Sequence, residues 1–334
     1  MRRRRTVAAA APVRAALIGA VLLGAAGCGA GAALPAPGPD RAAPTPAAPA
    51  SSSPTPSATP ATPATGPYAA LGDSYTSGLR IPPQGGSPQG CGRSGANYPS
   101  LVARQLGIAD FTDVSCSGAR TGDLTAAQRT DDGTNPPQLD ALSTATRLVT
   151  LGIGGNDAGF LDVLGRCAVE NVRHSLTGQG DAAPCRAYYT TGTGRGEVQR
   201  KMTATGERLT AALGEIRRRA PQAEVLLVGY PALLPQDPAR CAETLGSGIA
   251  GADLGFVTEQ EQQLNGMLRQ RAEAAGVGFV DTYASSAGHD MCEAAGTRWI
   301  EPLAADRGLA PIHPNAQGQQ GMAAAVLAAL RQQH

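Results

Sequence analysis

Lysine is almost absent from this 334-residue sequence, which contains Lys201 and no other. Its 28 basic side chains include five arginines before Cys28, where no acidic residue stands. Without these five, the sequence has 23 basic and 27 acidic side chains, a net charge of −4. Nucleic-acid binding needs a clustered basic face that neutralises phosphates, and a mildly acidic body does not supply one. We therefore expect no nucleic-acid partner.

Signatures of metal and nucleotide binding are missing as well. The seven cysteines form no C-x-x-C pair and no group with the spacing of zinc ligands, so we expect no metal. The turn after the first expected strand, at Gly72, lacks the G-x-G-x-x-G pattern of dinucleotide-binding folds. The G-x-S-x-G nucleophile elbow of the α/β-hydrolases is also absent. The sequence thus implies a protein that works without a cofactor.

The first 28 residues are typical of an export signal. Arginines at positions 2–5 precede the apolar stretch Ala15–Gly27, which is shorter than the about 20 apolar residues that span a membrane. Leu23–Cys28 resembles a bacterial lipobox, in which the cysteine is acylated and becomes the first residue, although Ala25 stands where leucine is usual. We expect a lipid anchor on Cys28 at the outer face of the cell membrane. Secretion of a free extracellular protein is the alternative.

Residues 29–66 consist almost entirely of Ala, Pro, Ser, Thr and Gly, with no large apolar side chain after Leu34. Such a segment cannot bury a core, so we expect a disordered tether. The folded domain is then expected over residues 67–334, as a monomer that touches a membrane through its N-terminal anchor alone. Six cysteines follow Cys28, and an exported protein meets an oxidising compartment where disulfides are the expected state. Six cysteines allow 15 pairings, so their number does not fix the pairs.

Short apolar runs alternate with helical patterns along the expected domain. Two stretches, 165–196 and 232–256, show no regular pattern and resemble long inserted loops. Thr258 and Glu261 form a capping box that would open a helix. Alternating strands and helices imply an α/β fold, in which helices cover both faces of a parallel sheet. Strands are expected at residues 68–71, 111–115, 148–153, 225–228 and 277–280, and helices at 98–106, 198–220, 258–275 and 315–330.

Polar groups stand at the ends of three of these elements. Gly72–Tyr75 follows the first strand, Gly154–Asp157 follows the strand at 148–153, and His313–Asn315 precedes the last helix. Ligands of open parallel sheets bind beyond the carboxyl ends of the strands. A hydroxyl, an amide and an imidazole at one edge supply what acyl transfer requires, namely a nucleophile, an oxyanion donor and a general base. Each motif alone is weak, because Gly-Asp-Ser is also an ordinary turn, but chance does not readily explain all three together.

The same residues carry a resemblance to a known family. Ala70–Tyr75, Gly154–Asp157 and His313–Asn315 resemble blocks of the SGNH, or GDSL, hydrolases, and Ser117–Ala119 resembles the remaining block, a glycine beyond the second strand. The likeness runs from Tyr68 to the C-terminus and is strongest to secreted actinomycete lipases and esterases with three disulfides. It implies a three-layer α/β/α, flavodoxin-like fold around a five-stranded parallel sheet. It also implies hydrolysis of carboxylic esters, with an ester or lipid as substrate.

The resemblance assigns roles to single residues. Ser74 would be the nucleophile and His313 its general base. The backbone N–H groups of Ser74 and Gly118 and the side-chain amide of Asn156 would form the oxyanion hole. Independently of the resemblance, we expect Asp73 and Asp157 to support the turns through hydrogen bonds rather than to act as catalytic acids. The disulfides that the resemblance implies are Cys91–Cys116, Cys167–Cys185 and Cys241–Cys292, of which the last two would restrain the two long loops.

One position departs from the family pattern. Most members have an aspartate three residues before the catalytic histidine, and here that residue is Ala310. We expect the main-chain carbonyl of Ala310 to orient the imidazole, because this pattern resembles that of some secreted actinomycete relatives, which use the main-chain oxygen at that position. The alternative is that the carboxylate of Asp306 takes this role. His289 is the rival for the general base, although no helix follows it to set its geometry.

Other functions stay open at this point. One is a non-catalytic surface lipoprotein on a hydrolase fold, although a binding module has no reason to keep Ser74, Asn156 and His313 together. A second is a carbohydrate esterase or a thioesterase of the same family. The sequence does not give the length of the acyl chain.

Overall fold

The computed structural model describes residues 66–241 and 251–332. They lie within the unit Ala58–His334. The predicted export signal, the anchor at Cys28 and the tether up to residue 65 lie outside the described residues.

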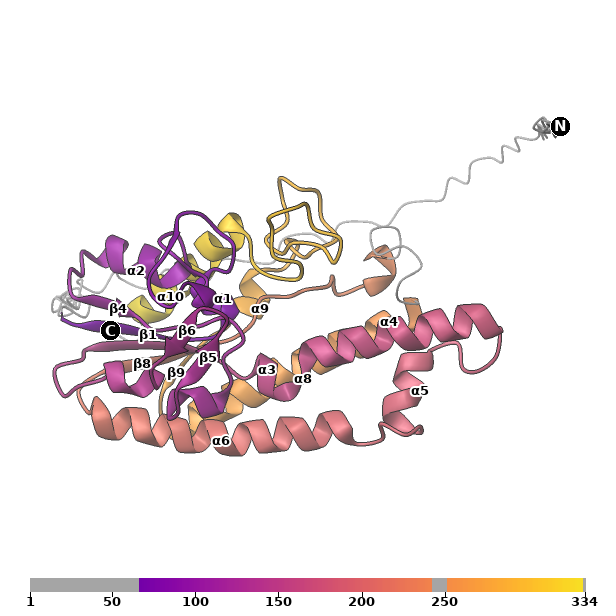
Figure 1. Cartoon of the computed structure of the whole chain (residues 1–334), viewed down its shortest axis with the longest axis horizontal. Helices are drawn as coiled ribbons and strands as arrows, with labels where there is room; N and C mark the ends of the chain where they lie inside the picture. The colour runs from indigo at the N-terminus through magenta and orange to yellow at the C-terminus, as the bar shows by residue number, and fades with distance from the viewer. Residues whose placement is uncertain (1–65, 242–250, 333–334) are drawn as a thin grey trace, which may run out of the picture. The chain divides into compact units, whose positions relative to one another are not determined.

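A five-stranded sheet lies at the centre of the described unit, in the order β4-β1-β7-β8-β9 (Figure 1). Every neighbouring pair of strands is parallel. The predicted α/β fold with a five-stranded parallel sheet is therefore confirmed. The strands are β1 (Tyr68–Gly72), β4 (Phe111–Asp113), β7 (Leu148–Gly152), β8 (Glu224–Val228) and β9 (Gly278–Val280).

Long helices cover both faces of this sheet, because the strand side chains alternate between two apolar faces. Tyr68 and Ala70 of β1 pack in one buried cluster with Val102 and Val326, from the helices α2 and α10. Leu71 belongs to the other cluster, with side chains from α6 and α8. The bounds of these helices are α2 (Tyr98–Leu106), α6 (Glu197–Arg219), α8 (Gly251–Ala275) and α10 (Ala316–Gln332).

The stretch 165–196, predicted to be an irregular loop, is largely helical. It contains most of α4 (Phe160–Thr177) and all of α5 (Pro184–Thr190). Val163, Leu164 and Cys167 of α4 are buried, a helical spacing that begins before the predicted loop and was obscured by the polar residues and glycines after it. The prediction of a loop was therefore wrong for most of this stretch.

The predicted start of the helix at Thr258 was also wrong, since α8 begins at Gly251. The Thr258 hydroxyl donates to the Leu254 carbonyl oxygen at 3.1 Å, a bond within the helix rather than a cap. Leu254 and Val257 are fully buried, so packing extends the helix past the local capping signal. Residues 242–250 of the second predicted loop lie outside the described residues.

Three disulfides join Cys91 to Cys116, Cys167 to Cys185, and Cys241 to Cys292, the pairs that the family resemblance implied. Cys167–Cys185 links α4 to α5, so it holds two helices together rather than a loop. Within residues 66–241 and 251–332, no helix has both the length and the apolar character to cross a bilayer.

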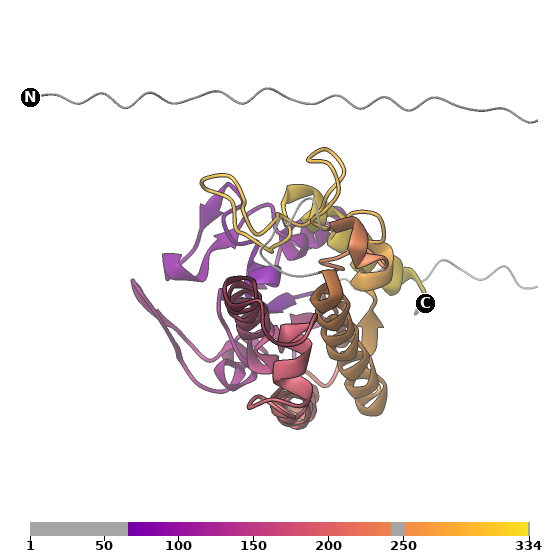
Figure 2. The same cartoon turned by 90° about the vertical axis from the view of Figure 1, so that its right-hand side faces the viewer.

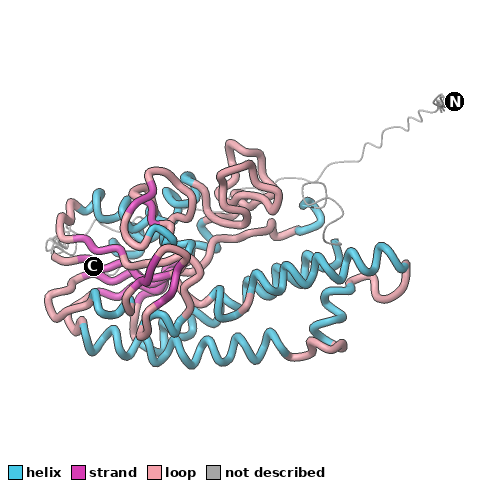
Figure 3. Tube along the Cα trace, in the orientation of Figure 1, coloured by secondary structure: helices cyan, strands magenta, loops and turns pink. Residues whose placement is uncertain are grey.

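Short elements complete the described unit, and most of them lie among the loops coloured pink in Figure 3. They are α1 (Ser74–Ser77), α3 (Gly155–Ala158), α9 (Thr282–Ser285), the strand pairs β2 (Gln84–Gly85) with β3 (Arg93–Ser94) and β5 (Gln128–Thr130) with β6 (Gly133–Asn135), and the 3₁₀ helices η1 (Gln89–Cys91), η2 (Thr121–Leu124), η3 (Gln138–Ala141) and η4 (Pro238–Cys241).

Candidate active site

The carboxyl end of β1 places Ser74 at the first position of α1. Gly72 ends the strand with φ 150°, and a Cβ atom there would clash with the Thr76 side chain and the Gly152 carbonyl. The Asp73 carboxylate then caps α1 by accepting the Tyr75 backbone N–H at 3.0 Å. A tight glycine turn followed by an acidic cap therefore turns the chain sharply from strand to helix and sets the position of Ser74.

His313 reaches the same place from the segment between α9 and α10. Its Nε2 atom lies 2.8 Å from Ser74 Oγ, across 239 residues of sequence. Both side chains are buried, with 9% of His313 and 7% of Ser74 exposed. The backbone of His313 is held by the Glu301 N–H, which donates to its carbonyl oxygen at 3.0 Å. The structure thus brings the predicted nucleophile and base within hydrogen-bond distance.

The other ring nitrogen of His313 differs from the prediction by one residue. Nδ1 lies 2.7 Å from the carbonyl oxygen of Pro311 rather than that of Ala310. The Ala310 carbonyl instead accepts the His313 backbone N–H at 3.3 Å, closing a turn in which Ile312 has φ 61°. This left-handed residue rotates the preceding peptide, so the Pro311 carbonyl is the one that faces the ring.

The alternative residues lie elsewhere. Asp306 is exposed, and no bond joins it to His313 in the described part of the chain. His289 stacks on Trp299 with ring centroids 4.4 Å apart, and its Nδ1 lies 2.7 Å from the Thr297 carbonyl oxygen. Neither residue is therefore brought to Ser74.

Tyr75 is a site residue that the sequence did not single out. Its hydroxyl donates to the Ile312 carbonyl oxygen at 2.5 Å, and its ring lies 5.0 Å from the His313 ring, centroid to centroid. It follows Ser74 directly and so ties the helix that carries Ser74 to the loop that carries His313. Its position next to Ser74 was the available signal, but a contact 237 residues away in the sequence is not visible there.

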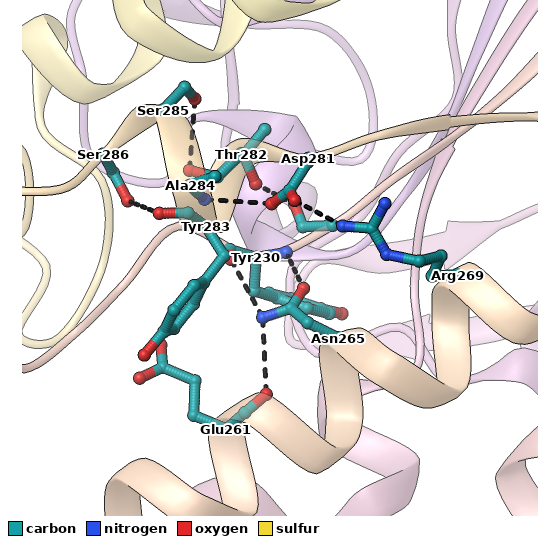
Figure 4. A network of polar contacts seen from close by, with 11 residues as sticks. Tyr230, Glu261, Asn265, Arg269, Asp281, Thr282, Tyr283, Ala284, Ser285 and Ser286 are labelled. Carbon is teal, nitrogen blue, oxygen red and sulfur yellow. Dashed lines mark hydrogen bonds and ion pairs between the residues drawn. The ribbon is translucent and has the colours of Figure 1, made fainter. Parts of the chain in front are cut away.

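Tyr230, just beyond β8, joins the other two strand ends. Its hydroxyl donates to Asp73 Oδ2 at 2.5 Å and accepts the Gly155 backbone N–H at 2.8 Å. Asn265 of α8 fixes the tyrosine backbone, since its Oδ1 accepts the Tyr230 N–H at 2.8 Å and its Nδ2 donates to the Tyr230 carbonyl at 3.1 Å (Figure 4). Sequence reasoning missed Tyr230 as well, because it belongs to none of the three motifs.

Asn156 lies in α3, directly after β7, and lines the same pocket as Ser74 and His313. Its Nδ2 donates to the Ala119 carbonyl oxygen at 2.9 Å, which brings it beside the turn that contains Gly118. That turn closes through the Ala119 N–H and the Cys116 carbonyl at 3.0 Å, with Gly118 at φ 75°. Ser74 and Asn156 therefore line one pocket, and the turn that contains Gly118 is bonded to Asn156.

Asp157, next to Asn156 in α3, fixes this helix to its neighbours. Its carboxylate accepts the Thr121 backbone N–H at 2.8 Å and the Thr121 hydroxyl at 2.5 Å, and it pairs with Arg208 at 3.3 Å. These bonds tie α3 to η2 and to α6. The predicted role of Asp157, a hydrogen-bonding support, fits these contacts.

Burial sets the charges of the site. It lowers the pKa of His313 below the ordinary value of 6.5, and the positive charge of Arg80 lowers it further, against the opposing effect of the Pro311 hydrogen bond. Burial also raises the pKa of Asp73 to about 7, although its hydrogen bonds from Tyr230 and Tyr75 act the other way. A neutral imidazole at neutral pH is free to accept a proton from Ser74.

The pocket around Ser74 is mostly walled by large apolar and aromatic side chains. They are Tyr75, Phe160, Leu161, Tyr230, Leu233 and Leu264, while Glu261 contributes a buried carboxyl group. A possible ligand cluster of another kind, Cys241, Asp290 and Cys292, gathers three groups within 4.8 Å. Its two cysteines form a disulfide with each other, so they supply no thiolate for a metal.

Comparisons with known proteins agree with this geometry. The chain matches the GDSL-like lipase/acylhydrolase family over residues 70–320. It is 42% identical over 259 residues to Lipase 2 of Streptomyces coelicolor, covering 77% of this chain and 83% of the relative. Phospholipase A1 from Streptomyces albidoflavus NA297 superposes with a TM-score of 0.61 at 29% identity, covering 80% of this chain and 100% of the other. An extracellular lipase from Streptomyces rimosus gives a TM-score of 0.60 at 29% identity, with coverages of 79% and 100%.

Proposed function

Because the chain belongs to the GDSL-like lipase/acylhydrolase family and is a hydrolase of carboxylic esters, we propose that Ser74 is its nucleophile and His313 its general base. The 2.8 Å separation of Ser74 Oγ and His313 Nε2 carries this proposal. It is the distance over which a hydroxyl proton passes to an imidazole nitrogen.

The tautomer of His313 follows from its second contact. The Pro311 carbonyl oxygen can only accept a hydrogen bond, so Nδ1–H is the donor and Nε2 carries the free lone pair that faces Ser74. Pro311 thus does for the imidazole what a carboxylate does in a three-residue triad, namely hold its orientation. We propose a Ser–His pair oriented by a main-chain carbonyl.

The reaction then has two halves. Ser74 Oγ attacks the ester carbonyl carbon as its proton moves to His313 Nε2, and the imidazolium returns that proton to the departing alcohol. Water next attacks the acyl-serine with His313 again as base, which releases the acid and restores the hydroxyl. The backbone N–H groups of Ser74 and Gly118 and the Asn156 amide would stabilise the oxyanion in both halves.

The pocket favours an acyl chain over a sugar as the bound part of the substrate. Phe160, Leu161, Leu233 and Leu264 offer apolar surface, which suits hydrocarbon rather than hydroxyl groups. We propose that the substrate is a fatty-acyl ester or lipid. We also propose that the enzyme acts outside the cell as a monomer, free or anchored through Cys28.

Labelling with a fluorophosphonate tests the assignment of the nucleophile. We expect the wild-type protein to be labelled on Ser74, and Ser74→Ala and His313→Ala to lose both labelling and hydrolysis of p-nitrophenyl esters. Ser77→Ala is the matched control, because Ser77 lies in the same short helix, one turn further on. Undiminished labelling of Ser74→Ala would contradict the proposal. A series of p-nitrophenyl esters of increasing length then measures the acyl preference.

A further inference from the structure

Exposed apolar side chains are concentrated on one helix. Among the described residues, the large apolar side chains most exposed to solvent are Leu161 (48%), Val169 (55%), Val172 (52%), Leu176 (81%) and Leu303 (40%). All but Leu303 belong to α4. Single exposed apolar residues are common on soluble proteins, whereas a contiguous group marks a surface that meets a partner.

The four α4 side chains form one stripe. With about 100° of rotation per residue, they fall within about 80° around the helix axis. Within α4, Gly165 is the one other residue in this sector, so the sector holds no charge. The acidic residues and arginines of the helix all lie to one side of this sector, from about 100° to about 180° around the axis, at Asp162, Arg166, Glu170 and Arg173.

A different face of α4 already anchors the helix to the domain. Val163, Leu164, Cys167 and Asn171 are buried on that face. The helix packs against α5 and α8 (Figure 2). The exposed stripe is therefore a second apolar face, not the core-facing side of a poorly packed helix.

Further bonds make α4 a rigid support for this stripe. The disulfide Cys167–Cys185 fastens it to α5. The Asn171 side-chain amide donates to Asp253 of α8 at 2.8 Å, and the same carboxylate accepts the Cys185 and Arg186 backbone N–H groups at 3.0 Å. The stripe thus keeps a fixed position relative to the pocket.

The stripe is continuous with the active-site pocket. Phe160 and Leu161, at the start of α4, line the pocket that contains Ser74 and His313. From there α4 leads away from the sheet edge (Figure 1). Leu161 therefore belongs to both surfaces, and whatever covers the stripe lies at the mouth of the pocket.

We propose that the stripe Leu161–Val169–Val172–Leu176 is the face by which the enzyme lies on an aggregated lipid substrate. A protein partner seated there would obstruct the pocket, whereas a lipid surface is itself the source of the acyl chains that enter it. An uncharged apolar sector with charged side chains on one side of it is also compatible with a helix that lies in the plane of a membrane interface. The inference rests on the proposed function, since it gives a location to the substrate of that same site.

The test uses the distal half of the stripe, which lies outside the pocket lining. The variant is Val172→Gln/Leu176→Gln, in the full chain with Cys28→Ser throughout so that no acyl chain is attached at that position. Glutamine is a good helix former, so the helix should persist. The matched control is Thr177→Gln, an exposed and uncharged position about 100° round the helix from Leu176.

Two readouts separate surface contact from catalysis. The first is co-flotation with phosphatidylcholine vesicles, and the second is kcat/KM on dissolved p-nitrophenyl acetate and on an emulsified long-chain ester. Each substitution by Gln should weaken partitioning of the protein into the lipid roughly three- to tenfold. We therefore expect the double variant to bind vesicles and to hydrolyse the emulsion about 10- to 100-fold less well. Its rate on p-nitrophenyl acetate, and all values of the control, should stay within about twofold, as surface changes usually do.

Other outcomes overturn the inference. Vesicle binding by the double variant at the wild-type level would do so. A second contrary outcome is a wild-type protein that sediments as a dimer and a double variant that is monomeric but binds lipid unchanged. The stripe would then be covered by a second copy of the chain. Ser74→Ala distinguishes the two proposals, because it should lose hydrolysis of both esters and keep vesicle binding. If it stays active, the proposed function fails, whatever the stripe does.

Discussion

The Tyr75 hydroxyl donates to the Ile312 carbonyl oxygen at 2.5 Å, so the neighbour of Ser74 is bonded to the neighbour of His313. The tyrosine ring also lies 5.0 Å from the imidazole, centroid to centroid. A contact outside the pair itself therefore helps to set the distance between Ser74 and His313.

Tyr75→Phe should lower kcat without a matching change in KM. The ring would stay, but the loop that carries His313 would lose one hydrogen bond, worth about 1–1.5 kcal/mol, or about tenfold in rate. Steady-state kinetics on p-nitrophenyl butyrate measures this. Tyr283→Phe removes a hydroxyl bonded at an exposed position to Gln262 and serves as control. Equal rates for wild type and Tyr75→Phe would show that the bond does not position His313.

Asn156→Ala should lower turnover by about 10²–10³-fold, the usual cost of losing one oxyanion donor. Asn156 also donates to the Ala119 carbonyl, so the melting temperature must be measured beside kcat to separate local disorder from lost stabilisation. A near-normal kcat in a folded variant would remove Asn156 from the proposed oxyanion hole.

Asp306→Asn should change kcat by no more than about twofold, as is usual for a surface side chain away from the site. Asp306 is exposed, and the Pro311 carbonyl already occupies the position beside His313 Nδ1. Loss of an orienting acid costs on the order of 10⁴-fold in kcat, so a loss on that scale would identify Asp306 as the third member of a triad.

The pH dependence of kcat/KM should reveal the environment of His313. Burial and Arg80 lower its pKa, so activity should fall only as the pH drops through a midpoint below 6.5, where the ring becomes protonated. Arg80→Gln removes a positive charge and should move this midpoint upward. Arg307→Gln, an exposed change on the same loop as His313, is the control. A midpoint that stays unchanged in Arg80→Gln would exclude this charge as a cause.

Glu261 should make the protein less stable as the pH rises. Burial raises its pKa well above 4.5, so above that pH the unfolded chain releases the proton before the native protein does. The unfolded state then binds fewer protons, and the free energy of unfolding falls as the pH rises from 4.5 towards the native pKa. Each proton contributes a slope of up to about 1.4 kcal/mol per pH unit.

Glu261→Gln should flatten this slope in urea unfolding between pH 4 and 8. The Gln side chain can still accept the Leu233 N–H, as Glu261 Oε1 does at 2.9 Å, while Glu261 Oε2 is buried without a partner among the described residues. Glu259→Gln, exposed on the same helix, is the control. Asp73 adds a slope of the same sign up to its pKa of about 7, so some pH dependence should remain. Identical slopes in wild type and Glu261→Gln would contradict the prediction.

The sequence was sufficient to predict the sheet and the three motifs because parallel strands end at one edge. Ser74 and Asn156 follow adjacent strands, β1 and β7, so the fold class alone brings them together. The choice of Pro311 over Ala310 depends on the left-handed backbone of Ile312, which no local pattern announces. The bond from Tyr230 to Asp73 spans 157 residues and appears only once the chain is folded.

The helix α4 was not predicted because its apolar residues occupy two faces. Its outward face carries leucine and valine where a surface helix usually carries polar side chains, so its apolar residues do not repeat as a single stripe. Two apolar faces on one helix blur the pattern that identifies helices in a sequence.

Strand β8 supplies neither of the two proposed reacting groups, yet Tyr230, just beyond its end, constrains the motifs that follow β1 and β7. Tyr230 is bonded to the residue before Ser74 and to the residue before Asn156. In laboratory evolution, positions of the loop after β8 should therefore differ in how well they tolerate substitution. Leu233, further along that loop, can be varied to reshape the wall of the pocket, whereas replacement of Tyr230 or of its partner Asn265 would misalign two strand ends at once.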